Sequence, residues 1–297
     1  MTKIRIVTHS GGFHADDVFG VATLQLLLAG NEIEVIRTRD PEIIRSGDYV
    51  LDVGGVYDPA TCRFDHHQAG GAGKRENGIP YASIGLIWKA FGAQVCLSQE
   101  VADDIETRLI QTIDAFDNGI DTYTATTPGV YPYIISTAMF AFTSLGVEVE
   151  NFDNRFSEAV AWVTVLLKKE ILSATNRVAV FVSAHKSYEE ASDKSLVVCE
   201  GKLSREVLME AFQKYQDVIY FIKQHADGTW QVVCGVDDVH VYKNRKDLPA
   251  SWAGKQGSEL ADITGVPDAV FCHNGRFMAI TKTKEGAIKL AELALSA

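Results

Sequence analysis

A regular alternation of strand-like and helix-like segments at the start of the chain constrains its fold most. Apolar or alternating runs predict strands at residues 4–8, 32–37 and 49–53. Helical periodicity between them predicts a helix over residues 14–28 and a helical turn over residues 41–46. This order is typical of an α/β domain built on a parallel sheet. Because ligands bind at the carboxyl ends of parallel strands, the residues that follow these strands are the first candidates for a functional site.

Histidines and aspartates directly follow two of the predicted strands. His9, His14 and Asp16 come after the first strand, and Asp65-His66-His67 follows a strand that ends at Phe64. Imidazole nitrogen combined with carboxylate oxygen favours Mn, Zn, Fe or Co over Ca and Mg, which prefer oxygen alone. The sequence therefore predicts a divalent metal site at this edge of the sheet.

Each acidic candidate also has a structural interpretation. Asp16 and Asp17 fall in the first turn of a predicted helix, where the helix dipole favours carboxylates in any protein. Because His9 and His14 flank the same strand-to-helix turn, metal ligation is the favoured interpretation. Asp52 closes a strand and precedes two glycines, which suits either a carboxylate bridging two metals or an ordinary glycine turn.

Two further segments carry charge near these candidates. A glycine-rich stretch over residues 69–78 contains Lys74 but lacks the Walker A pattern, so it is either a basic flap over the site or a disordered loop. A predicted helix from residue 99 to about 116 runs into Asp114 and Asp117. Since helix C-termini disfavour carboxylates, this pair calls for a compensating partner.

Composition bounds the partners and the location. The net charge of −11, from 39 acidic and 28 basic residues, argues against tight binding to duplex DNA or RNA. No apolar run approaches a membrane span, and the first residues lack the pattern of a signal peptide. Five cysteines without a CxxC pair indicate reduced thiols. We therefore expect a cytoplasmic protein that binds no membrane; an oligomer is compatible with the sequence.

The second half of the chain reads as a smaller α/β domain. A chain of 297 residues is long enough for two domains, and we place them at residues 1–174 and 175–297. Helices are predicted over residues 131–144, 152–174, 205–214 and 283–294. Strands are predicted over residues 178–183, 196–199, 218–222, 229–236 and 269–280. The long helix over residues 152–174 is expected to link the domains.

Several short motifs occur in a fixed order along the chain. They are His9 with His14-Ala15-Asp16-Asp17, Leu51-Asp52-Val53-Gly54-Gly55, Arg63-Phe64-Asp65-His66-His67-Gln68, Pro80-Tyr81-Ala82-Ser83 with Trp88, and residues 114–119. In this order they resemble the DHH phosphoesterase superfamily and, more narrowly, the melanocyte-proliferating-gene (Myg) family of metal-dependent hydrolases. Phe271-Cys272-His273-Asn274-Gly275-Arg276-Phe277, followed by residues 282–287, is similar to the C-terminal signature of that family. The resemblance covers nearly the whole chain.

The resemblance implies a site with two divalent ions. One ion would be held by His9, His14 and Asp52, and the other by Asp16, Asp52, His66 and Asp117, with Asp52 bridging. We expect Mn²⁺, with Mg²⁺ as the alternative, because His14 stands where an aspartate is commoner in the superfamily and imidazole suits manganese better. Asp114 competes with Asp117 for its role, and the following Asn118-Gly119 turn favours Asp117.

The resemblance also implies roles at the reacting phosphate. His67 would face the phosphate, Asp65 would orient the two histidines from behind, and Asp17 is the third catalytic candidate. The candidates for substrate binding are Lys74, Ser83, His273 and Arg276.

The predicted function is that of a two-metal phosphoesterase, in particular a 3′–5′ exonuclease acting on single-stranded RNA or short oligonucleotides. One alternative is a hydrolase of small phosphate compounds such as nucleotides, pyrophosphate or cyclic dinucleotides. The other is a non-catalytic protein with a structural metal. A structural zinc site is closed by four protein ligands, whereas this sequence offers more candidates than four.

Overall fold

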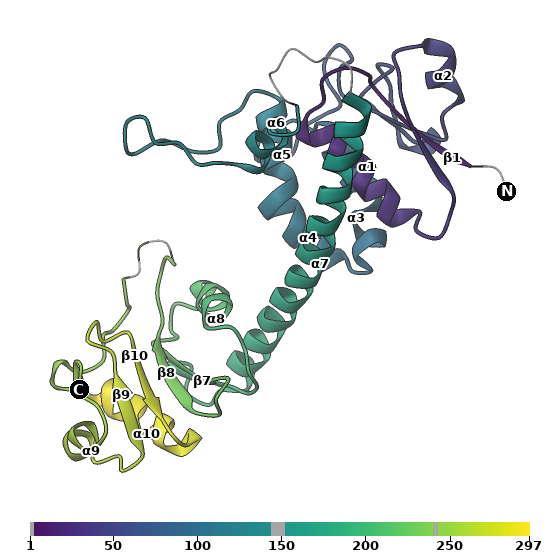
Figure 1. Ribbon diagram of the computed structural model, residues 1–297. Helices are drawn as coiled ribbons and strands as arrows, with labels where there is room; N and C mark the ends of the chain where they lie inside the picture. Colours follow the sequence, from purple (N-terminus) through teal and green to yellow (C-terminus); the bar gives the residue numbers. More distant parts are fainter. Residues whose placement is uncertain (1–2, 144–151, 240, 242) are drawn as a thin grey trace. The chain divides into compact units, whose positions relative to one another are not determined.

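The computed structural model describes residues 3–143, 152–239, 241 and 243–297. The chain forms two compact units, Met1–Thr175 and Asn176–Ala297. Figure 1 shows the elements of both units, and the long helix α7, Phe152–Glu190, contributes residues to each.

The first unit is built on a five-stranded sheet that is parallel apart from one edge. Its strands are β1 (Ile4–Thr8), β2 (Ile33–Arg37), β3 (Tyr49–Leu51), β4 (Tyr57–Asp58) and β5 (Arg63–Phe64), in the order β2-β1-β3-β5-β4. β1 pairs in parallel with β2 and β3, and β3 pairs in parallel with β5. Only β4, which pairs with β5, is antiparallel. The predicted α/β class is therefore confirmed, and β1, β3 and β5 end at the same edge of the sheet.

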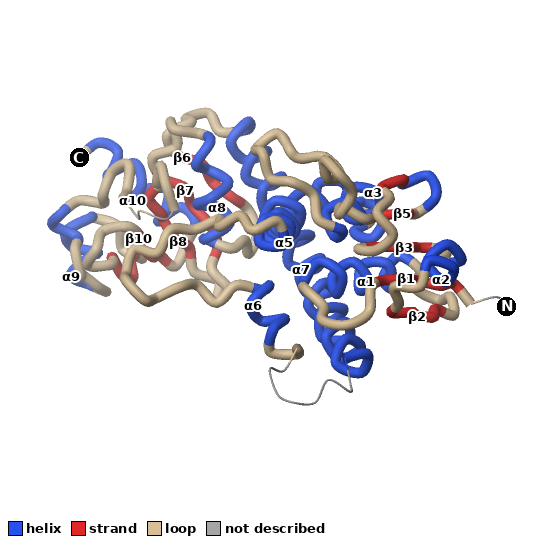
Figure 2. The backbone as a smooth tube through the Cα atoms, turned by 90° about the horizontal axis from the view of Figure 1, so that it is seen from above, coloured by secondary structure: helices blue, strands red, loops and turns tan. Residues whose placement is uncertain are grey.

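Helices of the first unit cover this sheet and supply residues next to its edge. They are α1 (Ala15–Leu27), α2 (Pro41–Ser46), α3 (Ser83–Cys96), α4 (Gln99–Ile105), α5 (Gln111–Asp117) and α6 (Ile135–Phe140), with a 3₁₀ turn at Pro59–Thr61 and a π-helical turn at Glu106–Ile110. Residues 15–24 of α1 are all buried, because α1 packs against both the sheet and α3 (Figure 2). A Cβ atom on Gly20 would lie 2.5 Å from Leu51 of β3 and 3.0 Å from Ile87 of α3. Only glycine permits this close packing.

The helix α7 covers the helix predicted over residues 152–174 and continues beyond it. Phe156, Val160, Val163 and Leu167 are buried at helical spacing. The strand predicted at residues 178–183 is wrong, since these residues extend α7 to Glu190. Its alternating valines favour a strand locally, but Val180 and Ala184, one helical turn apart, are buried in the core of the second unit. Tertiary packing overrides the local preference here.

The helix predicted over residues 131–144 is shorter in the structure. Only Ile135–Phe140 is helical, and residues 120–134 form a loop. Pro132 disfavours helical geometry at the residue before it, and Pro128 with Gly129 interrupts helical geometry further upstream. Ser144, the last residue of the prediction, lies outside the described residues.

The second unit is a smaller α/β body around a mostly antiparallel sheet. Its strands are β6 (Leu196–Cys199), β7 (Tyr220–Gln224), β8 (Trp230–Cys234), β9 (Ala269–Cys272) and β10 (Met278–Thr281), in the order β6-β7-β8-β10-β9. Its helices are α8 (Arg205–Ala211), α9 (Ser258–Thr264) and α10 (Lys284–Ser296), with 3₁₀ turns at Phe212–Lys214 and Ala250–Trp252. One face of the sheet packs against α10, and the other packs against α8 and the end of α7. Both cores are apolar.

Two further features bear on the predictions. Within the described part of the chain, no helix has both the length and the apolar character needed to cross a membrane. All five cysteines are free.

Candidate metal centre

Three groups of histidine and aspartate side chains converge in the first unit. Within each group, one candidate ligand atom per residue lies within 4.8 Å of the others. The groups are His9 with Asp17 and Asp52, Asp52 with His66 and His67, and His14 with Asp16 and Asp117. Asp52 belongs to two of them, so it joins the residues that follow β1 to those that follow β5.

His9 lies directly after β1 and is almost fully buried. Its Nε2 atom is 3.3 Å from Oδ2 of Asp17 and 3.2 Å from Oδ2 of Asp52. The other oxygen of Asp17 accepts a hydrogen bond from the backbone N–H of His14 at 3.0 Å, which fixes the first turn of α1. This helix cap begins α1 close to the end of β1. Residues 9, 14 and 17 are thereby brought together.

Asp52 has an unusual backbone conformation directly after β3. Its φ of 56° lies in the left-handed region, which side-chain-bearing residues rarely adopt. This turn directs the two carboxylate oxygens to different partners. Oδ2 faces His9, whereas Oδ1 lies 3.3 Å from Nε2 of His66 and accepts a hydrogen bond from Oγ of Ser83 at 3.3 Å. Strained backbone of this kind is often found where a side chain has a functional position to hold.

His66 connects Asp52 to the end of α5. Its Nε2 atom is 3.3 Å from Oδ2 of Asp117 and 3.9 Å from Oδ2 of Asp16. Nδ1 of His14 lies 3.9 Å from the other oxygen of Asp117. The carboxylate at the end of α5 is thus compensated by imidazoles, as its place at a helix C-terminus requires.

His67 is the exposed member of the cluster and is held by Asp65. Its Nδ1 atom lies 2.7 Å from Oδ1 of Asp65, which also accepts the backbone N–H of His67 at 3.1 Å. The buried Asp65 takes a third hydrogen bond from the N–H of Gly55 at 2.5 Å. Because an ionised carboxylate only accepts hydrogen bonds, the proton resides on Nδ1 of His67, and Nε2 is left to face outward.

The cluster is strongly coupled electrostatically. Burial alone lowers the pKa of His9, but the carboxylates of Asp17 and Asp52 outweigh it and raise the pKa to about 10. Burial raises the pKa of Asp16 well above its usual value, and the nearby carboxylates of Asp52 and Asp117 raise it further. Burial also opposes ionisation of Asp52, yet His66 and His9 hold its pKa below the usual range. The group as a whole stabilises added positive charge.

The donor set fits divalent metal ions. Both carboxylate oxygens of Asp16, Oδ2 of Asp17 and Nε2 of His66 are buried, and within the described residues they have no hydrogen-bond partner beyond the imidazole–carboxylate contacts given above. Buried polar atoms are normally satisfied, so these four atoms, which belong to residues of the three groups, are suited to ligate a cation. Imidazole nitrogen with several carboxylate oxygens is the ligand type of manganese and related ions.

The structure groups the predicted residues as follows. His14 lies with Asp16 and Asp117, and Asp17 lies with His9 and Asp52. The hydroxyl of Ser83, a predicted substrate residue, donates a hydrogen bond to Asp52. Asp114 is buried against the guanidinium of Arg75, 2.7 Å away, and Asp117 occupies the cluster.

The remaining predicted substrate residues lie outside this cluster. Lys74 is exposed in an ordered turn closed by a bridge to Pro80. His273 and Arg276 belong to the second unit, where Nδ1 of His273 accepts the N–H of Gly275 at 2.9 Å. Arg276 has a φ of 55° and pairs with Asp247 at 2.6 Å.

Two arginines near the cluster were not singled out from the sequence. Nη2 of Arg39 lies 3.3 Å from Nδ1 of His9. Arg37 is buried between the rings of Phe13 and Phe156, and its Nη2 atom donates to the carbonyl of Gly11 at 2.6 Å. It therefore ties the loop after β1 to α7. Arg37 is the last residue of β2 and Arg39 follows it, and this position at the end of a strand beside β1 is the feature by which sequence reasoning could have identified them.

The fold and the site define an α/β protein whose sheet edge carries a candidate metal centre. Residues 5–295 match the family model MYG1_exonuc, described as an uncharacterised protein family (UPF0160). The chain belongs to this family, which confirms the resemblance of its motifs to the Myg family.

Similar proteins occur in distant organisms. "MYG1 exonuclease" of Bos taurus is 29% identical over 329 residues, covering 100% of this chain and 86% of the relative. "MYG1 exonuclease" of Homo sapiens is 28% identical, covering 100% and 87%. "MYG1 protein" of Dictyostelium discoideum is 27% identical, covering 98% and 96%. The similarity therefore includes both units.

Proposed function

We propose that this protein is a metal-dependent exonuclease that removes nucleotides from the 3′ end of single-stranded RNA or short oligonucleotides. Relatives that this chain covers over 86% and 87% of their length bear the name exonuclease, which supports hydrolysis of nucleic acid. The free cysteines support a reducing compartment such as the cytoplasm. The net charge of −11 argues against a long basic surface for the substrate. It supports a substrate held mainly by the metal ions and by few other contacts.

The observation that carries the proposal is the position of Asp52. One carboxylate oxygen faces His9 and the other faces His66, at 3.2 Å and 3.3 Å. A carboxylate that reaches two ligand groups is the arrangement needed to bridge two ions. A closed structural site with four ligands has no need of this geometry.

In this proposal the ligands fall into two sets that share Asp52. His9 and Asp17 accompany Oδ2, and the set around Oδ1 consists of His66, Asp16, Asp117 and His14. These residues would hold two divalent ions, Mn²⁺ or Mg²⁺, which would supply Lewis acidity toward the phosphate and activate water for attack. Ser83 holds Asp52 in place through its hydroxyl.

The exposed residues at the rim would handle the substrate phosphate. Asp65 fixes the tautomer and direction of His67, so that Nε2 of His67 faces the solvent side where a phosphate arrives. Arg39, beside His9, carries a permanent positive charge that suits a phosphate oxygen. These two side chains orient the substrate and stabilise charge on the phosphate.

The second unit is assigned the remaining part of the substrate. His273 and Arg276 lie in the turn between β9 and β10, and we propose that they contact a phosphate of the strand. In the free protein the guanidinium of Arg276 pairs with Asp247. This ion pair would have to open before Arg276 contacts the phosphate.

A panel of substrates tests this function. Turnover with Mn²⁺ would be compared for single-stranded RNA, single-stranded DNA, duplex RNA, mononucleotides and pyrophosphate. The proposal expects single-stranded RNA or short oligomers to be cut fastest and duplexes to be cut slowly. Preferential hydrolysis of mononucleotides or pyrophosphate would contradict the exonuclease assignment while leaving the metal chemistry in place.

A further inference from the structure

A buried lysine in the second unit has no partner for its charge. Lys223 on β7 is 4% exposed. Across the described residues, its ammonium group makes neither a hydrogen bond nor an ion pair. Burial lowers the pKa of Lys223, and the more distant carboxylate of Glu206 opposes this effect. The side chain is therefore largely shielded from water without a carboxylate bound to its ammonium group.

The place of Lys223 follows from the alternation of side chains along β7. Tyr220 and Ile222 pack into the core beneath α10, whereas Phe221 packs into the core beneath α8. Lys223 therefore lies on the α8 face of the sheet, two residues beyond Phe221. Its neighbour across the antiparallel pair is Gln231, which is 6% exposed. Two buried polar side chains thus stand side by side on an otherwise apolar face.

These side chains line a basic pocket of about 500 Å³. We call it the Lys223 pocket; its other polar walls come from Lys202, Ser204, Arg205, Glu206 and His225. The volume is in the range of small-ligand sites. Three permanently or normally cationic side chains face one carboxylate, so the pocket is positive within a chain of net charge −11.

The single carboxylate of the pocket is already engaged. Glu206 pairs with Arg205 at 3.1 Å and accepts the hydroxyl of Ser204 at 3.0 Å. Nζ of Lys202 donates to the carbonyl of Ala226 at 3.0 Å, which leaves its charge uncompensated. The charge of Lys223 therefore stays available to an anion that enters the pocket.

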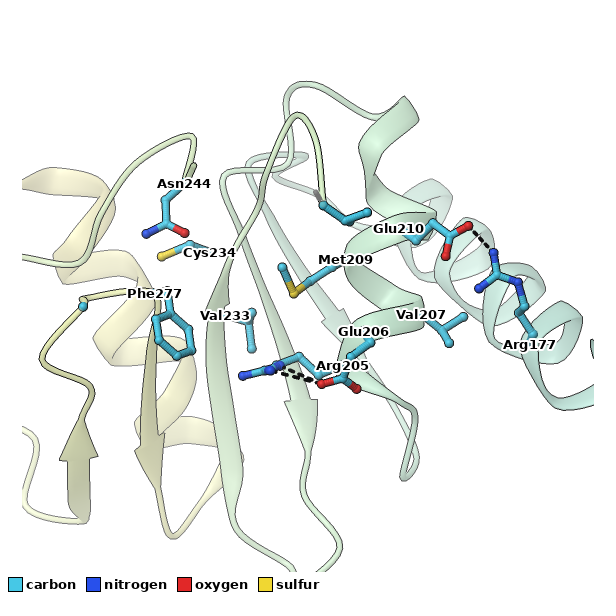
Figure 3. A pocket seen from close by; sticks show the side chains of 12 residues that line it. Arg177, Arg205, Glu206, Val207, Met209, Glu210, Val233, Cys234, Asn244 and Phe277 are labelled. Carbon is cyan, nitrogen blue, oxygen red and sulfur yellow. Dashed lines mark hydrogen bonds and ion pairs between the residues drawn. The ribbon is translucent and has the colours of Figure 1, made fainter. Parts of the chain in front are cut away.

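An apolar cavity adjoins the Lys223 pocket. It has a volume of about 330 Å³ and shares Arg205 and Glu206 with the basic pocket. Figure 3 shows the Arg205–Glu206 pair beside Val233, and it shows Phe277 next to the neighbouring strand. The guanidinium of Arg205 lies 5.6 Å from the centre of the Phe277 ring. A planar base attached to the anion would find an aromatic wall here.

We propose that the Lys223 pocket binds a phosphate group, and that the adjoining cavity takes the nucleoside attached to it. The ligand class is a nucleoside phosphate, supplied by the strand or by the released nucleotide. The nucleotide source rests on the proposed function, whereas phosphate binding does not.

Binding without metal and without hydrolysis tests the proposal. Affinity for inorganic phosphate and for AMP would be measured by calorimetry in chelator at constant ionic strength. The variant is Lys223→Met, and the matched control is Lys289→Met, an exposed lysine of α10. We expect wild type and control to bind both probes, and Lys223→Met to lose about tenfold or more in affinity for each.

A second readout separates binding from folding damage. Because methionine removes an unpaired buried charge, the ligand-free Tm of Lys223→Met is expected to equal or exceed that of wild type. Lys202→Met, at an exposed wall of the pocket, supplies an independent variant and is expected to weaken phosphate binding several-fold. Wild-type affinity for phosphate in both variants would overturn the proposal.

The two probes also identify the source of the phosphate. Tighter binding of AMP than of phosphate supports the nucleotide assignment, and a further loss for AMP alone is expected in Phe277→Ala. Equal or weaker binding of AMP overturns the nucleotide source. A protein that binds phosphate at Lys223 yet cuts no RNA would contradict the proposed function and leave this site standing.

Discussion

Nε2 of His66 lies 3.3 Å from Oδ1 of Asp52, although the two residues follow different strands of the sheet. The contact exists because β3 and β5 are adjacent parallel strands that end at the same edge. On its other side, Asp52 meets His9 from the end of β1. The topology of the sheet therefore brings His9, Asp52 and His66 together, although His9 and His66 are 57 positions apart.

The first prediction concerns the bridging role of Asp52. Asn tolerates the left-handed φ of this position, so Asp52→Asn should fold normally. It should bind fewer Mn²⁺ ions than wild type and lose about 10³-fold in hydrolysis, which corresponds to about 4 kcal/mol. Metal content by mass spectrometry and circular dichroism would check this, with the exposed Asp262→Asn as control. Unchanged metal content would argue against a shared ligand.

The second prediction concerns the orientation of His67. Asp65→Asn presents an amide to Nδ1 of His67 and weakens the preference for its protonated tautomer. We expect kcat to fall by about 10- to 100-fold while metal content changes less, as for residues that orient a catalytic group. Steady-state kinetics give kcat and KM. A variant that lost only metal, with normal kcat when saturated, would show that Asp65 acts through the ions.

The third prediction concerns the packing of α3 against the buried ion pair. A Cβ atom on Gly85 would overlap Oδ2 of Asp114 and lie 2.8 Å from Nη2 of Arg75. Since both partners are buried, Gly85→Ala should lower the free energy of unfolding by about 1–3 kcal/mol or more. Urea unfolding measures this, and Gly12→Ala, where nothing lies within 4 Å, is the control. Equal free energies of unfolding for the two variants would mean that Arg75 and Asp114 move aside at little cost.

The sequence was sufficient to predict the strand ends and the residue types of the site. His9, Asp52 and His66 are all found where their positions after strands suggested, because the carboxyl ends of parallel strands coincide. The long apolar stripe of α7 was equally readable, since helical periodicity depends only on local spacing.

The sequence was insufficient where distant contacts decide. The contact between Arg39 and His9 depends on the pairing of β2 with β1, and the left-handed turn at Asp52 has no signature in a non-glycine residue. The valines after residue 177 alternate as in a strand, yet packing makes them helical. The pairing of Asp114 with Arg75 could also not be read locally, because 39 positions separate the two residues.

The fourth prediction concerns pH and Asp114. Burial raises the pKa of Asp114 to about 7, against the opposing effect of Arg75. The folded protein then retains a proton that the unfolded chain releases near pH 4, so this group's contribution to stability is lost as pH rises from about 4 to 7. Its full size is at most about 4 kcal/mol.

Comparison with Asp114→Asn isolates this contribution. The free energy of unfolding of wild type minus that of the variant should decrease between pH 4 and 7 in chelator. Because asparagine keeps an acceptor for the N–H of Gly85, the variant retains that contact. A difference that stays constant or increases with pH would show that the ion pair with Arg75 keeps Asp114 ionised.

The fifth prediction tests the central claim most directly. A 5′-labelled single-stranded RNA oligomer is incubated with Mn²⁺, Mg²⁺ or chelator, using wild type, the His66→Ala, His67→Ala double variant, and His185→Ala as an exposed control. We predict a ladder that shortens from the 3′ end, requires metal, persists in the control and disappears in the double variant. Intact RNA with wild type under every metal condition, or an undiminished ladder with the double variant, would contradict a metal-dependent exonuclease at this site.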